Sequence, residues 1–69
     1  MVEIFKTNVN DSESALRLIG QLSAQYPQFK IKFDLDDCDR ILRVAGEGIC
    51  TSHFIEILES AGFECELIE

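Results

Sequence analysis

The pattern of hydrophobic and polar residues along the chain predicts four strands. The clearest signal is FKIKFDL (residues 29–35), where hydrophobic and polar side chains alternate strictly. This alternation is typical of a strand with one face buried. Three further segments have the β-branched and aromatic content of strands: VEIFKT (2–7), RILRVAG (40–46) and FECELI (63–68).

Two other segments have hydrophobic residues at helical spacing. The first is SALRLIGQLSAQY (14–26), and Pro27 ends it, because the residue before a proline avoids the helical conformation. Asn10 is a good N-cap, and Glu13 lies three residues later, at the spacing of a capping box. We therefore predict that these two residues close the start of the first helix.

The second helix is predicted over TSHFIEILESAG (51–62). Thr51 or Ser52 is expected to cap its start, and Gly62 to end it. The order of elements is then β-α-β-β-α-β in one domain, residues 1–69. The compact solution is an α+β, ferredoxin-like sandwich with a four-stranded antiparallel sheet in the order 4-1-3-2 and both helices on one face.

Because the helices cover only one face of this sheet, the other face is expected to be open. We expect the covered face to hold Val2, Ile4, Phe29, Ile31, Phe33, Leu42, Val44, Phe63 and Leu67. The opposite parity leaves Phe5, Ile41 and Ile68 on the open face, on three neighbouring strands. Hydrophobic patches of this kind often mark interfaces. We therefore predict that a partner protein or a second copy of the chain docks there, inside a polar rim of Lys30, Lys32, Asp34 and Arg43.

The charge of the chain excludes some functions. Asp and Glu number 13 against 6 Lys and Arg, which gives a net charge of −7. Nucleic-acid binding needs clustered cations, whereas these six are scattered along the sequence, so we expect no nucleic-acid partner. No hydrophobic run approaches the length of a membrane span, and the N-terminus does not resemble a signal peptide. Three cysteines, an odd number, favour a reducing cytoplasmic location with free thiols.

The stretch FDLDDCDRILRV (33–44) places four aspartates around Cys38. An EF-hand calcium loop counted from Asp34 would need Gly and Glu where Asp39 and Ala45 stand. A zinc site would need a second thiol within a few residues of Cys38. The pattern therefore favours a solvent-facing turn between two strands. The alternative is a metal site that combines Cys38 with Asp36 or Asp37.

Cys50 and His53 form the other candidate pair, at i, i+3 near the start of the second helix. They could ligate an ion, but a structural zinc site needs four ligands. They could also form a thiolate pair, but the sequence shows no oxyanion hole or third group. We therefore predict no catalytic site. Cys65 is expected to be a small core residue, far from the other two thiols.

The segments IFKTNV (4–9) and DLDDCDRILRV (34–44), with the order of elements, resemble the heavy-metal-associated domains of copper chaperones and metal-transporting ATPases, and most of all small bacterial relatives. The resemblance covers essentially the whole chain and implies the same fold. Those domains hold a soft ion with Cys-x-x-Cys in the loop after the first strand. Here the two positions fall at Asn10 and Glu13, whose oxygens are poor Cu(I) ligands. The resemblance therefore implies the fold without the metal ligands, and we expect no cofactor.

Together these features predict a non-enzymatic interaction or regulatory module. One alternative is a metal-binding protein with the non-standard ligands described above. Another is a small-molecule-sensing domain, because other domains with this order of elements bind amino acids at their interfaces. An acylphosphatase is disfavoured, because its loop would need to cradle an anion and TNVNDSE (7–13) carries acids instead.

Overall fold

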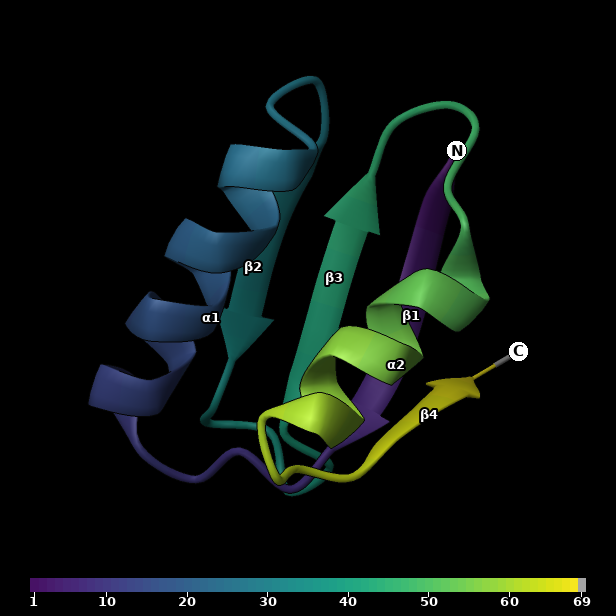
Figure 1. Cartoon of the computed structure of the whole chain (residues 1–69). Helices are drawn as coiled ribbons and strands as arrows, with labels where there is room; N and C mark the ends of the chain where they lie inside the picture. The colour runs from purple at the N-terminus through teal and green to yellow at the C-terminus, as the bar shows by residue number, and fades with distance from the viewer. Residues whose placement is uncertain (69) are drawn as a thin grey trace.

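A computed structural model describes residues 1–68 and has the predicted order of elements (Figure 1). The elements are β1 (Val2–Thr7), α1 (Ser12–Gln25), β2 (Lys30–Asp34), β3 (Ile41–Ala45), α2 (Thr51–Ser60) and β4 (Cys65–Ile68). All neighbouring strands are antiparallel, and the sheet order is β2-β3-β1-β4. This is the predicted order 4-1-3-2 read from the opposite edge. Both helices lie on one face of the sheet, so the predicted α+β fold is confirmed.

The core between the sheet and the helices is built around an aromatic cluster. Phe54 of α2 stacks on Phe5 of β1 and on Tyr26, with ring centroids 5.9 and 5.1 Å apart. Tyr26 also stacks on Phe29, at 5.2 Å. Burial of one such side chain contributes about 1.5–3 kcal/mol. The cluster therefore holds both helices to the sheet.

The predicted parity of β1 is wrong. Phe5, which we expected on the open face, is fully buried and is opposite Leu42 and Leu67 on the covered face. Val2 and Ile4, expected inward, lie on the open face instead, opposite Ala45 and Arg43. Hydrophobic residues occur at both parities of this strand, so alternation alone does not choose a face. Burial of the larger phenylalanine removes more apolar surface from water and decides the parity.

The start of α1 also differs from the prediction. Asp11, not Asn10, is the N-cap, and its Oδ2 accepts a hydrogen bond of 2.9 Å from the Ser14 backbone N–H. Both residue types cap well, but the carboxylate also interacts with the positive end of the helix. This hydrogen bond, given by the Ser14 backbone, is the main cause that lowers the pKa of Asp11. Glu13 is exposed and pairs with Arg17 at 3.4 Å.

The ends of α2 are partly as predicted. Its N-cap is Cys50 rather than Thr51 or Ser52, and no side chain caps it. Its C-terminus is confirmed at Gly62, which has a φ of +92°. The Gly62 and Phe63 N–H groups donate to the carbonyls of Glu59 and Leu58, both at 3.0 Å. This is a Schellman motif, which satisfies two carbonyls at the end of the helix.

Candidate functional site

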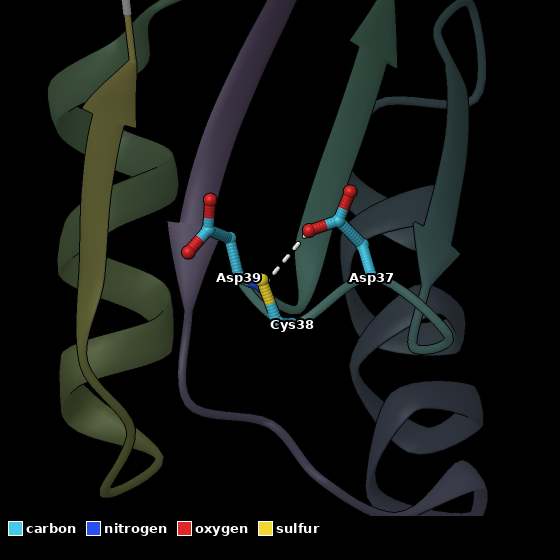
Figure 2. A group of neighbouring side chains, drawn as sticks. All are labelled: Asp37, Cys38 and Asp39. Carbon is cyan, nitrogen blue, oxygen red and sulfur yellow. Dashed lines mark hydrogen bonds between the residues drawn. The ribbon is translucent and has the colours of Figure 1, made fainter.

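The aspartate-rich stretch forms the turn between β2 and β3 (Figure 2). The Asp39 N–H donates to Asp37 Oδ1 at 2.9 Å, and the Arg40 N–H donates to the Asp37 carbonyl at 3.0 Å. Arg40 has a φ of 48°, and its guanidinium donates to the Leu35 carbonyl. Asp37 therefore closes the turn with its own side chain, a common role for Asp.

This turn is attached to the end of β1. The Thr7 N–H donates to the Asp39 carbonyl at 3.1 Å, and the Thr7 hydroxyl donates to the Arg40 carbonyl at 2.6 Å. Lys6 Nζ lies 3.7 Å from Asp39 Oδ1. Thr7 is buried, and these two hydrogen bonds reach the turn, while its hydroxyl oxygen also accepts from the Val9 N–H at 3.2 Å. The conformation of residues 37–40 is therefore explained by structural contacts.

The same turn brings together three side chains that could ligate an ion. Potential ligand atoms of Asp37, Cys38 and Asp39 all lie within 4.8 Å of one another. Figure 2 shows the two carboxylates on either side of the Cys38 sulfur. Asp36, which we predicted as a possible ligand, is not in this group, and Asp39, which we did not predict, is. One thiolate and two carboxylates suit a divalent ion such as zinc better than Cu(I), which prefers sulfur.

Cys50 and His53 lie at the opposite end of the sheet, in and after the β3–α2 connection (Figure 1). Cys50 Sγ lies 3.6 Å from the Ser52 hydroxyl, and this contact is the main cause that lowers the pKa of the exposed thiol. His53 Nδ1 instead forms a hydrogen bond with the Tyr26 hydroxyl. The side chains of this candidate pair thus have different partners, and they form no hydrogen bond with each other.

Asn10 and Glu13, the two positions that the resemblance aligned with a metal loop, are exposed at the start of α1. In the same loop, Asn8 contacts the α2–β4 connection: its Oδ1 accepts from the Glu64 N–H at 2.8 Å, and its Nδ2 donates to Glu64 Oε2 at 3.2 Å. These contacts fix the loop to the chain that precedes β4. The loop after β1 is thus a structural connection.

A cleft of about 260 Å³ opens beside this connection. Its lining includes Lys6 and three carboxylates, and Cys65 lies within it (Lys6, Thr7, Asn8, Glu59, Glu64, Cys65 and Glu66). Burial, and to a lesser extent the negative charge of Glu59, raises the pKa of the Cys65 thiol to about 12. Cys65 therefore belongs to the core as predicted. The volume is below the range of about 300–1,000 Å³ typical of small-molecule sites.

The open face consists of the outward side chains of the four strands. Partners in an antiparallel register share a face, so the register defines three rows. The central row runs Lys32, Arg43, Ile4, Ile68; the flanking rows run Asp34, Ile41, Lys6, Glu66 and Lys30, Ala45, Val2. Val2 is 53% exposed and Ile68 is 38% exposed. Ile41 faces this side as predicted, but it is only 7% exposed and offers little surface.

The open face also concentrates positive charge. Four of the six cations lie on it: Lys6, Lys30, Lys32 and Arg43. Asp34 and Glu66 are the carboxylates on the strands of this face within residues 1–68, and Asp39 of the β2–β3 turn pairs with Lys6. The face is therefore net positive in a chain whose net charge is −7. We predicted Lys30, Lys32 and Arg43 around this face; the strand register confirms this and adds Lys6.

No protein-family model, curated protein or solved structure matches the chain. Neither helix within residues 1–68 combines the length and the hydrophobicity that crossing a lipid bilayer requires.

Proposed function

We propose that this chain is a non-enzymatic interaction module that binds a partner protein through the open face of its sheet. One observation carries the proposal. Val2, Ile4 and Ile68 place apolar surface on two neighbouring strands, on the side opposite both helices. Apolar surface with a polar rim is the usual composition of a docking site.

The contacts elsewhere in the molecule support this proposal over a catalytic one. The candidate pair of a nucleophile and a base, Cys50 and His53, interacts with Ser52 and Tyr26 respectively. The aspartate turn and the loop after β1 are used for structural hydrogen bonds. The open face is the feature that these structural contacts leave without a role.

Site-directed photo-crosslinking tests the proposal. A photoreactive amino acid replaces Ile4 in one variant and Leu16 in a control. Leu16 is 70% exposed on α1 and is thus an apolar residue on the opposite side of the molecule. We expect a protein adduct from position 4 and none from position 16. The captured protein is then purified, and its affinity for the unmodified chain is measured by calorimetry.

The matched substitutions are Ile4→Glu and Leu16→Glu. If Ile4 lies within the contact, Ile4→Glu should weaken the affinity by about thirtyfold, the loss typical of an interface hot spot, whereas Leu16→Glu should leave the affinity unchanged. Equal affinities for the two variants would contradict the proposal. An adduct between two copies of the chain would show that the open face mediates self-association and does not bind a partner protein.

The cluster of Asp37, Cys38 and Asp39 supports a second candidate function, the binding of a divalent ion, because their potential ligand atoms lie within 4.8 Å of one another. Titration with Co(II), a spectroscopic substitute for zinc, tests it. A sulfur-to-metal absorption band that is lost in Cys38→Ser and kept in Cys50→Ser would support the candidate. No band, or a band lost only in Cys50→Ser, would contradict it. Tight Cu(I) binding is not expected from a single thiolate.

A further inference from the structure

The chemistry of the open face specifies the kind of partner, an inference that rests on the proposed function. Lys32 of β2 and Arg43 of β3 are direct cross-strand partners. Like charges placed opposite each other destabilise a sheet. Among residues 1–68 neither side chain forms an ion pair; the two ion pairs there are Lys6 with Asp39 and Glu13 with Arg17. The sheet thus keeps two adjacent cations without a balancing carboxylate.

Outside the row of Asp34, Ile41, Lys6 and Glu66, the cations of the face lie on β2 and β3, and its larger apolar side chains lie on β1 and β4. In the central row, the β2–β3 half carries Lys32 and Arg43, and the β1–β4 half carries Ile4 and Ile68. Lys30 extends the positive half, and Val2 extends the apolar half. A ligand that covers these two rows must therefore present carboxylates along one side and apolar side chains along the other.

A second copy of the chain meets these requirements poorly. If two open faces stack, each brings more cations than carboxylates, and the pair of faces has a net positive charge. Cations buried in such a contact would lose water without gaining a partner, which is costly. Charge complementarity therefore favours an acidic ligand over a second copy.

The size of the face fits a segment of chain. Four strands at about 4.8 Å spacing and about 17 Å length measure about 19 by 17 Å. A short helix or an extended peptide has dimensions that fit this footprint.

We infer that the open face binds a short acidic segment of a partner protein, with the carboxylates of the segment on Lys30, Lys32 and Arg43 and its apolar side chains on Val2, Ile4 and Ile68. Recognition then combines ion pairs on one half of the sheet with apolar contact on the other. Binding weakens as salt concentration rises, because the ion pairs are exposed and screened.

Fluorescence anisotropy with three labelled probes tests the inference. The first probe is a peptide of leucine and glutamate about twelve residues long, sufficient to cover the face as a helix. The second has lysine in place of each glutamate. The third is a single-stranded DNA oligonucleotide of the same charge as the acidic peptide. We expect the acidic peptide to bind most tightly, with an affinity that falls by about tenfold or more when salt is raised from low to physiological strength.

Arg43→Glu and Arg17→Glu form the matched pair of variants. Both reverse one arginine, but Arg43 lies on the open face and Arg17 on α1, paired with Glu13. Arg43→Glu should weaken binding of the acidic peptide by about tenfold, and Arg17→Glu should leave it close to that of the wild type. Circular dichroism confirms that both variants are folded before affinities are compared.

The other outcomes separate this inference from the proposed function. Equal binding of the two peptides, lost in Ile4→Glu, would overturn the acidic partner and keep the docking function. Tighter binding of the oligonucleotide would overturn both. Equal effects of Arg43→Glu and Arg17→Glu would show a response to net charge alone and would overturn the inference. If the acidic peptide binds weakly and sedimentation shows a dimer, the open face binds a second copy of the chain and not an acidic segment.

Discussion

The two faces of the sheet have the same backbone and opposite environments. On the covered face, β1 buries Phe5 against Phe54, and the neighbouring strand β3 adds Leu42 and Val44, which are fully buried. On the open face, the same strand presents Val2 and Ile4, and Ile4 lies beside Arg43 and its cross-strand partner Lys32. The residues of the covered face pack together and exclude water. The residues of the open face leave like charges adjacent and apolar surface exposed. This arrangement contributes little to stability and suits binding.

The largest expected contrast is between neighbouring residues of β1. Phe5→Ala should lower the free energy of unfolding by about 3–5 kcal/mol, because it empties a fully buried site, whereas Ile4→Ala should change it much less. Urea unfolding followed by circular dichroism measures both. Equal losses would show that the two faces of β1 are buried alike and would remove the basis of the comparison.

The cysteines provide a second contrast between covered and exposed positions. The pKa of about 12 for Cys65, against an ordinary value of 9.0, means that near neutral pH its thiolate fraction is lower by roughly a thousandfold. Cys38 and Cys50 are exposed. Thiol labelling of the native protein should therefore modify two cysteines rapidly and Cys65 very slowly, and raising the pH towards 12 should accelerate the third reaction. Mass spectrometry of quenched samples identifies each site.

In the labelling experiment, Ser52→Ala is a control that affects one of the two exposed thiols. The Ser52 hydroxyl contributes most to the lowered pKa of Cys50. Its loss should therefore slow labelling of Cys50 near neutral pH and leave Cys38 unchanged. Rapid labelling of Cys65 in the native state would contradict its place in the core.

A glycine tests how closely the covered face is packed. A Cβ atom added at Gly46, which has a φ of +154°, would lie 2.3 Å from Cδ1 of Phe29. Gly46→Ala should therefore cost about 1–3 kcal/mol through overpacking. Gly20→Ala is the control: it lies in α1 with no atom within 4 Å of the added Cβ, and it should stabilise by about 0.5–1 kcal/mol. Thermal unfolding of both variants would show shifts of opposite sign, and a neutral Gly46→Ala would indicate a loosely packed Phe29.

The smallest expected effect lies on the open face, and its sign is informative. Lys32→Glu places a carboxylate opposite Arg43 and replaces a repulsive pair by an attractive one. It should stabilise the fold by about 0.2–1 kcal/mol at low salt, and the gain should shrink as salt rises. The same variant should lose affinity for the acidic peptide. A destabilised Lys32→Glu would mean that Lys32 already has a stabilising partner.

Much of the architecture follows from local features of the sequence. Strict alternation over residues 29–35, helical spacing before Pro27 and the glycine at 62 predict strands and helix ends from local physics alone. Their order leaves few compact arrangements, so the sheet order could be derived as well. The N-cap of α1 was missed by one residue, because Asn10 and Asp11 are both good caps and only the path of the chain after β1 selects between them.

The candidate sites depended far more on contacts between distant residues. The sequence indicated that FDLDDCD forms a turn, but not that Thr7, from a different strand, holds that turn in place. It also indicated that one face of the sheet is open, but it placed Phe5 on that face, whereas Phe5 is buried in the core.

What the sequence determined by itself is therefore the set of elements and their order, because helix and strand periods, caps and turns act over a few residues. What only the tertiary structure decided is which side of β1 is buried and which cations become neighbours. Both depend on the register between strands, where the burial of one large aromatic side chain outweighs the local pattern, and where Lys32 and Arg43, eleven positions apart in the chain, become adjacent.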